Sequence, residues 1–314
     1  MKRIVVAIAA VALAVFASSC GKVEQSAAGG KHKIGILAPA VTHGWVAAVE
    51  LAAEKRCKEL PDVEYKILTS SDAAEMTSQL DDLEAWGAKA IDTFPQWTGM
   101  EVPLAAAIQR GVHVVSFDIA VDVPGVYLVS GDNESMGVGS AKYLFEKLGP
   151  EATIAVMPVP ISGSVSALRV KGFMDTYPTL APNWKIVEQA TKFTREAGLT
   201  DFADVLMANP HIDGVFSIDD ETSIGILQAI QEAGRTDIKV VTGGGGCQEY
   251  FKMMPENKDI WIQSALYSPN MVVEAVNAAY GLLTGAEVQR QLVIPTTIVD
   301  RDNCADFLDA DSPY

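Results

Sequence analysis

The sequence predicts an α/β protein made of two lobes, each built around a doubly wound parallel sheet. Short apolar runs, typical of strands that are buried on both faces, alternate with segments of helical periodicity. The strands recur roughly every 25 to 30 residues, which is the spacing of βα units. The alternation starts at residue 33 and starts again after residue 132. Two similar α/β halves in succession predict two lobes with a ligand cleft between them.

The first of these units contains the most informative loop. Residues 33–38 are a short apolar run, residues 39–44 contain turn-forming residues, and a helical pattern begins at Trp45. In an open parallel sheet this loop lies at the carboxyl end of the strand, where such folds bind ligands. His43 and Trp45 are therefore candidates for ligand contact. Trp45 can also be a core residue at the start of a helix, and the sequence leaves both roles open.

The remaining elements follow the same alternation. In the first half, strands are expected at residues 63–69, 89–94, 113–117 and 126–130, and helices at residues 71–85 and 102–110. In the second half, strands are expected at residues 153–159, 184–191, 214–218, 239–242 and 260–265. The helices of that half are expected at residues 136–148, 162–177, 195–207 and 269–283, and one more ends at residue 233.

The first 32 residues are expected to direct and anchor the chain. Lys2 and Arg3 precede an apolar stretch, which is typical of a secretory signal peptide over residues 1–19. The residues before Cys20 resemble a bacterial lipobox, so Cys20 is expected to carry a lipid, followed by a flexible tether over residues 20–32. An ordinary secretory signal is the alternative. The chain is expected outside the cytoplasm, in the periplasm or at the cell surface.

Charge limits the partners of this chain. Lys and Arg total 24 and Asp and Glu total 40, so the formal net charge is −16. An acidic chain of this kind lacks the basic face that nucleic acid requires. It is also unsuited to anionic lipid, so membrane contact is expected only through the lipid on Cys20.

The patterns of cysteine, histidine and glycine do not indicate an enzyme or a metal site. Cys57, Cys247 and Cys304 have no partner at zinc-ligand spacing, and the histidines form no His-x-x-x-His pair. The glycines at residues 243–246 complete neither a dinucleotide fingerprint nor a Walker loop, and residues 163–167 are not a nucleophile elbow. We therefore expect no catalytic residue, no metal and no cofactor.

A set of residues in a fixed order resembles a known family. The set is Trp45, Asp118, Asp132-Asn133, Arg169 to Phe173, Phe193 and Asp219-Asp220-Glu221. With these residues in this order, the chain resembles the ribose-binding type of periplasmic substrate-binding protein over residues 33–303. Such proteins are the receptors of sugar ABC importers. The resemblance implies a type I periplasmic binding protein fold with a three-strand hinge. It also implies a monomer that binds a small sugar and partners an ABC permease.

The resemblance further implies where the lobes begin and end. Residues 33–132 plus 266–294 would form the N-terminal lobe, and residues 133–265 plus 295–314 the C-terminal lobe. Cys247 and Cys304 would then both lie in the C-terminal lobe. They would form a disulfide if their Cα atoms lie within about 7 Å, and Cys57 would stay free.

Sugar-binding roles are implied for several residues that follow the strands. Trp45 and Phe193 would cover the two apolar faces of a sugar ring. Asp118, Arg169 and Asp219 would bind its hydroxyl groups, because charged partners make the stronger hydrogen bonds. Asp219 can also be a helix N-cap, and the sequence leaves both roles open.

Other positions depart from the pattern of the family. Ile119 stands where the family has an Arg, and Leu266 where it has Gln or Asn. Either Gly243 or Gly244 stands where the family has an Asp. Trp97 is expected to compensate in part. Because these departures remove polar groups, the expected ligand is a small sugar or sugar-like polyol other than ribose, such as a deoxy sugar.

Three functions remain open at this point. The first is a lipid-anchored receptor that captures a sugar or polyol and delivers it to an ABC permease. The second is a receptor that signals to a membrane sensor without transport. The third is a secreted α/β enzyme. Turnover of a bound sugar would favour the enzyme, and loss of uptake on deletion would favour the transport receptor.

Overall fold

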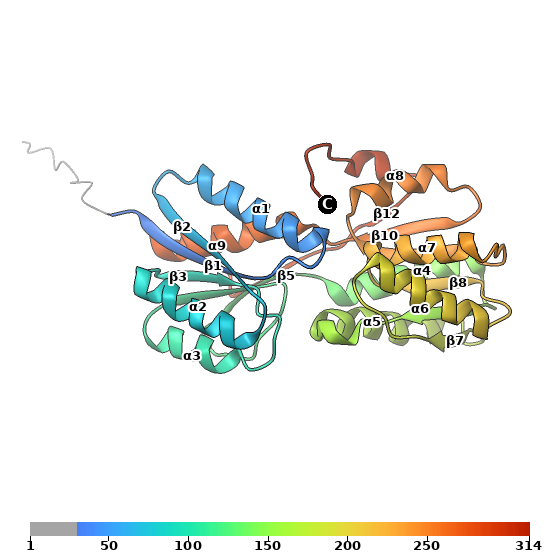
Figure 1. Ribbon diagram of the computed structural model, residues 1–314, viewed down its shortest axis with the longest axis horizontal. Coiled ribbons are helices and arrows are strands. Elements are labelled where there is room, and N and C mark those ends of the chain that lie inside the picture. The colour runs from blue at the N-terminus through green and yellow to red at the C-terminus, as the bar shows by residue number, and fades with distance from the viewer. Residues whose placement is uncertain (1–29) are drawn as a thin grey trace, which may run out of the picture. The chain divides into compact units, whose positions relative to one another are not determined.

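The computed structural model describes residues 30–314, of which Lys31–Tyr314 form one compact unit. Two six-stranded sheets organise this unit, one in each lobe (Figure 1). The expected signal peptide, the lipid attachment at Cys20 and most of the tether lie outside the described residues. Among the helices that are described, none is long and apolar enough to span a bilayer.

The sheet of the first lobe has the strand order β11-β5-β4-β3-β1-β2, and all its strands are parallel. The strands are β1 (His32–Pro39), β2 (Val63–Ser70), β3 (Ala90–Thr93), β4 (His113–Phe117), β5 (Tyr127–Gly131) and β11 (Gln291–Ile294). The helices are α1 (Gly44–Glu59), α2 (Ala73–Trp86), α3 (Glu101–Gln109), the 3-10 helix η2 (Pro269–Met271) and α9 (Val272–Thr284). Ile36 and Leu37, neighbours on β1, belong to separate hydrophobic clusters, so the sheet is buried on both faces.

The sheet of the second lobe has the order β12-β10-β9-β8-β6-β7. Its strands are β6 (Thr153–Met157), β7 (Lys185–Glu188), β8 (Gly214–Ser217), β9 (Val240–Gly245), β10 (Trp261–Leu266) and β12 (Ile298–Asp300). Its helices are α4 (Asn133–Leu148), η1 (Pro160–Ser162), α5 (Ser164–Leu180), α6 (Arg195–Ala208), α7 (Asp220–Glu232), α8 (Gln248–Glu256) and η3 (Cys304–Phe307). The edge strand β12 runs antiparallel to β10, whereas the other pairs are parallel.

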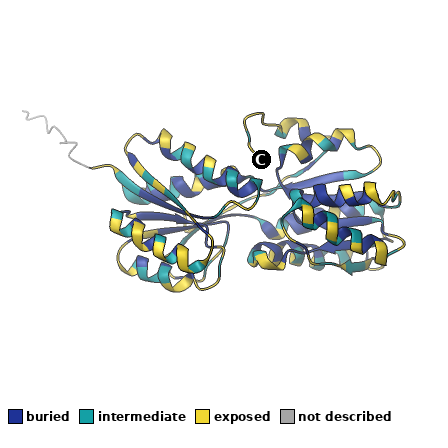
Figure 2. Cartoon of the chain, viewed as in Figure 1, coloured by how far each residue is buried: buried dark blue, intermediate teal, exposed yellow. Residues whose placement is uncertain are grey.

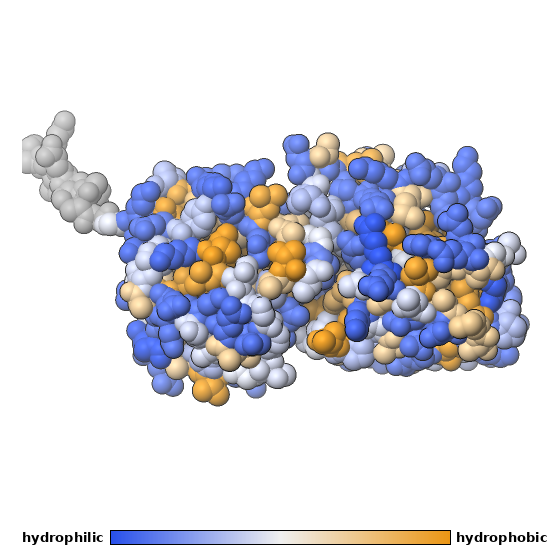
Figure 3. Space-filling model, viewed as in Figure 1, coloured by the Kyte–Doolittle hydropathy of each residue, from blue (hydrophilic) through white to orange (hydrophobic). Residues whose placement is uncertain are grey.

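These observations confirm the predicted α/β fold with two doubly wound lobes. The chain passes between the two sheets three times: after β5, after β10 and after β11 (Figure 1). The strands are the most deeply buried parts of both lobes (Figure 2). On the visible face, hydrophobic residues form separate patches among hydrophilic ones (Figure 3). The hydrophobic residues, which make up 49% of the chain, therefore lie mainly inside the lobes.

Several element boundaries follow from local chemistry. The Asp72 carboxylate accepts a hydrogen bond from the Glu75 amide and caps α2, and Gly87, with a φ of 98°, ends that helix. The strand expected at residues 153–159 ends at Met157 because Pro158 has no N–H to continue the ladder. The strand expected at residues 184–191 is shorter still, covering only Lys185–Glu188.

Close helix crossings in the second lobe depend on glycine. A Cβ atom added at Gly137 of α4 would lie 1.9 Å from the Arg169 carbonyl oxygen, and one at Gly172 of α5 would lie 2.0 Å from that of Glu134. On the other face, a Cβ at Gly225 of α7 would lie 2.0 Å from the Arg195 carbonyl oxygen. Each pair of helices therefore packs backbone against backbone. This contact sets the position of side chains at the ends of those helices.

Candidate functional site

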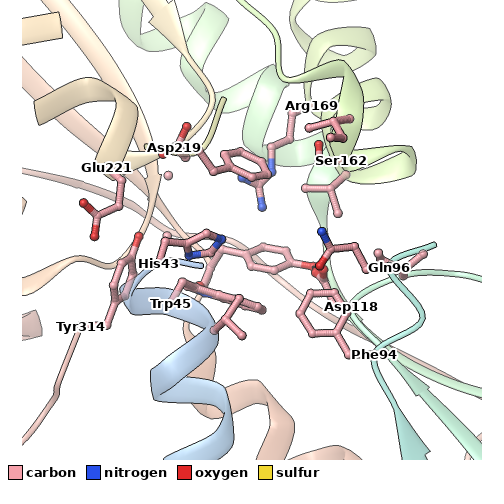
Figure 4. Close-up of a pocket in the computed structure, with 18 residues that line it drawn as sticks. His43, Trp45, Phe94, Gln96, Asp118, Ser162, Arg169, Asp219, Glu221 and Tyr314 are labelled. Atoms are coloured by element: carbon pink, nitrogen blue, oxygen red, sulfur yellow. The ribbon is translucent and has the colours of Figure 1, made fainter. Parts of the chain in front are cut away.

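A cavity of about 100 Å³ lies between the lobes and is lined by both of them (Figure 4). A buried water needs only about 10–15 Å³, so the space is large enough for a small molecule. The first lobe contributes His43, Trp45, Val46, Phe94, Gln96, Asp118 and Ile119, and the passage after β10 contributes Tyr267. The second lobe contributes Ile161, Ser162, Val165, Arg169, Phe193, Asp219, Glu221, Gly244, Gly245 and Tyr314.

Most of the residues expected at a ligand site line this cavity, and two do not. Those that do are His43, Trp45, Asp118, Arg169, Phe193, Asp219 and Gly244. Trp97 and Leu266 are absent from its lining. The strand ends of both sheets therefore converge on one space, as the carboxyl-end rule for parallel sheets predicts.

Trp45 packs in the core and also lines the cavity. Its ring is 8% exposed and stacks on Phe117, with centroids 6.0 Å apart and planes 7° apart. It meets Phe94 edge-on at 6.0 Å, and its indole N–H donates to the Tyr267 carbonyl oxygen at 2.8 Å. Trp45 is thus fixed by the core and still presents surface to the cavity.

His43 and Phe193 meet across the cavity from opposite lobes. Their rings form an edge-to-face pair with centroids 6.0 Å apart. Burial lowers the pKa of His43, and the nearby Glu221 carboxylate partly offsets this effect. The imidazole is therefore biased toward the neutral form. In that form it can both donate and accept a hydrogen bond.

Asp118 lies at the end of β4 with a buried carboxylate. Its φ of 67° is the one positive value among the non-glycine residues described. The Tyr267 hydroxyl donates a hydrogen bond to its Oδ1. Burial raises the pKa of Asp118, whereas the bond from Tyr267 and the charge of Arg169 act in the opposite direction.

Arg169 is 5% exposed and is held on several sides. Its Nε donates to Asn133 Oδ1 and its Nη1 to the Ile218 carbonyl oxygen, both at 2.8 Å. Its guanidinium lies 4.7 Å from the centroid of the Tyr267 ring. In Figure 4 the guanidinium points into the cavity. A ligand there would meet a cation that is already oriented.

Asp219 caps a helix and also lines the cavity. Its Oδ1 accepts from the Thr222 amide at 2.8 Å and caps α7. Its Oδ2 is buried and has no hydrogen-bond partner among residues 30–314. Burial raises the pKa of Asp219 to about 7. One oxygen is therefore occupied by the helix, and the other is left for a ligand.

The carboxylate of Asp220, next to Asp219, fixes the end of the glycine segment at residues 243–246 by hydrogen bonds. Its Oδ2 accepts from the amides of Gly246 and Cys247 and from the Ser264 hydroxyl. A Cβ atom at Gly244 would lie 2.6 Å from the Met136 Cε and 3.0 Å from the Ile218 carbonyl oxygen. The backbone of Gly244 can line the cavity because this position has no side chain.

Leu266 does not line the cavity, whereas the next residue does. Leu266 ends β10 and packs against the core, whereas Tyr267 lines the cavity. The Tyr267 hydroxyl accepts hydrogen bonds from the Gly131 amide at 3.2 Å and from Asn133 Nδ2 at 3.3 Å. Successive residues of an extended chain point to opposite sides, so a one-residue error in register exchanges a core residue for a site residue.

Trp97 does not line the cavity either. Trp97 packs against the hydrophobic cluster beneath α2 and α3. Phe94 and Gln96, from the same loop after β3, line the cavity instead. The loop does reach the site, as expected, but its conformation turns the tryptophan away. Glu221 and Tyr314 also line the cavity, although no sequence pattern assigns either of them a ligand contact.

The disulfide expected between Cys247 and Cys304 does not form. Among residues 30–314, both thiols are free and buried, as is that of Cys57. The Cys304 sulfur contacts the carbonyl oxygen of Arg301 in its own turn, whereas Cys247 lies at the start of α8 beside Asp220. Within the described residues, no group of metal-ligating side chains is found.

Comparison with protein families gives a match over most of the chain. The family described as "Periplasmic binding protein domain" matches residues 34–287. A Bacillus subtilis relative, the ribose import binding protein RbsB, is 26% identical over 265 residues, covering 83% of this chain and 85% of the relative. The xylitol-binding protein of Mycolicibacterium smegmatis is 25% identical over 239 residues, covering 74% and 67%.

Comparison with solved structures gives the same fold. An ABC transporter solute binding protein from Mycobacterium smegmatis, solved with bound glycerol, has a TM-score of 0.81 and 26% identity. The match covers 90% of this chain and 99% of that one. A Caulobacter myo-inositol binding protein bound to myo-inositol has a TM-score of 0.80 and 20% identity, covering 87% and 95%. At that identity the second match supports the fold alone.

Proposed function

Because the chain belongs to the periplasmic binding protein family, we propose that it captures a small sugar or sugar-like polyol and delivers it to an ABC transporter permease. Family membership confirms the resemblance to sugar receptors of ABC importers. It also supports an extracytoplasmic location and a binding protein rather than an enzyme. The relatives are named for ribose and xylitol, both small polyhydroxylated molecules.

The combination of aromatic and charged side chains in the cavity is the main support for this proposal. Trp45 and Phe193 offer apolar surface from opposite lobes. Asp118, Arg169 and Asp219 are buried beside them, and the Oδ2 of Asp219 has no hydrogen-bond partner in the described part of the chain. A sugar or cyclic polyol has apolar C–H surface and a polar rim. Aromatic rings can cover the first, and charged hydrogen-bonding groups can bind the second.

The identity of the polar groups suggests a ligand other than ribose. Ile119 lies in the cavity wall and offers no hydrogen bond. Tyr267, which directly follows β10, adds an aromatic ring to the cavity wall. Its hydroxyl is already hydrogen-bonded to Asp118. A ligand with an apolar or deoxy position facing Ile119 would leave fewer groups unsatisfied than ribose would.

A thermal-shift assay on residues 21–314 tests the function. The probes are D-ribose, D-allose, xylitol, myo-inositol and a deoxy sugar such as L-rhamnose. A ligand present at 100 times its dissociation constant should stabilise the native state by about 2.7 kcal/mol. At least one probe should raise the melting temperature, and a deoxy sugar or polyol should exceed ribose. No shift with any sugar or polyol would contradict the proposal.

The attachment to the membrane is a separate part of the proposal. Cys20 would carry the lipid, and the residues from there through 32 would tether the two lobes to the membrane. The N-terminal lobe would be residues 33–132 plus 266–294, and the C-terminal lobe residues 133–265 plus 295–314. Stable anchoring needs more than one acyl chain, so loss of the modified cysteine should release the protein. Cys20→Ala should therefore be found in the soluble fraction, with Cys57→Ala as the control. Unchanged membrane fractionation of Cys20→Ala would rule the anchor out.

A further inference from the structure

The segment Leu308–Tyr314, which follows η3, folds back toward the cavity (Figure 1). Gln248 at the start of α8 fixes its beginning: the Nε2 donates to the Phe307 carbonyl oxygen at 3.2 Å, and the Oε1 accepts from the Asp309 amide at 2.7 Å. The Ser312 hydroxyl donates to the Tyr314 carbonyl oxygen at 3.0 Å. These bonds give the segment a defined path that ends at Tyr314.

Tyr314 is buried although the segment before it is exposed. Its side chain is 6% exposed, whereas residues 308–311 lie at the surface. A Cβ atom at Gly44 would lie 3.0 Å from its Cδ2, and one at Gly245 would lie 2.6 Å from its hydroxyl oxygen. Gly44 begins α1 in the first lobe, and Gly245 ends β9 in the second. The ring therefore fits between two backbone positions that lack side chains, and it contacts both lobes.

Tyr314 lines the cavity beside Glu221, where its hydroxyl can contact a bound ligand. Figure 4 shows Tyr314 and Glu221 on one side of the cavity and Gln96 on the opposite side. The carboxylate of Glu221 is held by Arg195, whose Nε donates to it at 2.6 Å. Among residues 30–314, no hydrogen bond of the Tyr314 hydroxyl is found, although the backbone of Tyr314 is bonded. Buried tyrosine hydroxyls usually have a partner, and a ligand hydroxyl would supply one.

We propose that Tyr314 is a specificity-determining residue that contacts the bound sugar or polyol and forms the wall of the cavity beside Glu221. This inference rests on the proposed function and deepens it. The hydroxyl bonds a ligand hydroxyl, and the ring limits how far the ligand extends toward Glu221. The segment Leu308–Tyr314 holds the ring in place, so an element outside the repeated βα units completes the site.

The first experiment tests, without any ligand, whether Tyr314 covers the backbone at Gly44 and Gly245. Hydrogen exchange is measured by mass spectrometry on the wild type, on Tyr314→Ala and on Asp311→Ala, an exposed position of the same segment. Peptides that contain Gly44 or Gly245 should exchange faster in Tyr314→Ala, because both backbones lose the ring that covers them. They should be unchanged in Asp311→Ala. Equal exchange in the wild type and Tyr314→Ala would overturn the inference.

The second experiment measures affinity by calorimetry with D-ribose, D-allose, xylitol, myo-inositol and L-rhamnose. For the probe that the wild type binds most tightly, Tyr314→Phe should bind about tenfold more weakly, the loss of one hydrogen bond. Tyr314→Ala should bind still more weakly and should discriminate less among the probes. Asp311→Ala should match the wild type.

The outcomes separate the two proposals. Wild-type binding with unchanged affinities in Tyr314→Phe and Tyr314→Ala would overturn the role of Tyr314 and leave the proposed function standing. A wild type that binds none of the probes would contradict the proposed function itself, and the inference with it.

Discussion

At the scale of single residues, Asp118 combines a strained backbone with a buried carboxyl group. A left-handed conformation costs an ordinary L-residue roughly 1–2 kcal/mol, and Asp and Asn tolerate it best. At Asp118 this conformation accompanies a carboxylate that lines the cavity and bonds the Tyr267 hydroxyl. Strain of this kind tends to occur at ligand sites, where the surrounding structure enforces it.

Asp118→Asn should weaken ligand binding without changing the backbone. The amide tolerates the left-handed conformation but lacks the charge, and a hydrogen bond to a charged group contributes about 1.5–3 kcal/mol. Calorimetry with the probe that gives the largest thermal shift should show binding about 10- to 100-fold weaker. Asp122→Asn, at an exposed position of the same loop, should bind like the wild type. Equal affinity in both variants would place the site elsewhere.

Asp92 on β3 is a buried carboxylate outside the cavity lining. It is 2% exposed, and neither of its oxygens has a hydrogen-bond partner among the described residues. Burial raises the pKa of Asp92 well above its ordinary value. The folded state therefore holds the proton at pH values where the unfolded state has released it. The free energy of unfolding must then fall as the pH rises from the unfolded pKa, about 3.9, toward the raised folded pKa.

Asp92→Asn should remove this pH dependence. In the wild type, the contribution of Asp92 lowers stability by about 1.4 kcal/mol per pH unit in that window. Urea unfolding between pH 4 and pH 7 should show the variant gaining stability relative to the wild type as the pH rises. Asp82→Asn, an exposed change on α2, should follow the wild-type curve. Parallel curves for the wild type and Asp92→Asn would mean that Asp92 is ionised in the fold.

At the scale of elements, the crossing of α4 and α5 positions the cation of the site. Gly137 and Gly172 let the two backbones touch, and Arg169 lies on α5 at this crossing. From there its Nε reaches Asn133, the first residue of α4. The distance between helix axes depends on the size of the side chains between them. Small residues at the crossing are therefore part of the site, although they do not line the cavity.

Gly172→Ala should be destabilising and should also weaken binding. Its new methyl group would meet the Glu134 carbonyl oxygen at 2.0 Å, and overpacking of this kind typically costs about 1–3 kcal/mol. Gly139→Ala on α4 is the matched control. There the methyl group would meet no backbone atom but the Ile298 side chain, at 2.8 Å from its Cδ1 and 3.3 Å from its Cγ1. Urea unfolding and calorimetry should show both losses for Gly172→Ala alone, and equal behaviour of the two variants would contradict the packing argument.

At the scale of the whole molecule, the three passages between the sheets permit a hinge. Tyr267 lies just after β10, at one passage, and its hydroxyl contacts Gly131 and Asn133 at another. It also bonds Asp118 of the first lobe, while its ring lies against Arg169 of the second. A ligand held by Asp118 and Arg169 would therefore act on both lobes and on the passages that join them.

Ligand binding should bring the lobes together. Hinge closure around a ligand is a common transition of two-lobed binding proteins. X-ray scattering should show a smaller radius of gyration with a saturating probe than without it. The same probe should leave Asp118→Asn unchanged at a concentration that saturates only the wild type. A radius that stays constant for the saturated wild type would contradict closure.

The fold was predictable because its signals are local and repeated. Apolar strands, turn residues at their ends and amphipathic helices recur along the chain, and their alternation predicts parallel sheets in two lobes. The convergence of His43, Trp45, Asp118, Arg169, Phe193, Asp219 and Gly244 on one cavity was predictable for a related reason. The carboxyl ends of parallel strands meet at the same edge of a sheet, so the loops that follow them share a location.

Tertiary structure alone decided the remaining features of the site. The choice of Tyr267 over Leu266, and of Phe94 and Gln96 over Trp97, depends on which way the backbone turns over one or two residues. The free thiols of Cys247 and Cys304 depend on where two distant segments come to lie. Tyr314 reaches the cavity through contacts with Gln248, Gly44 and Gly245. Periodicity along the chain determines elements and their order, whereas contacts between distant residues depend on packing in three dimensions, which no local pattern encodes.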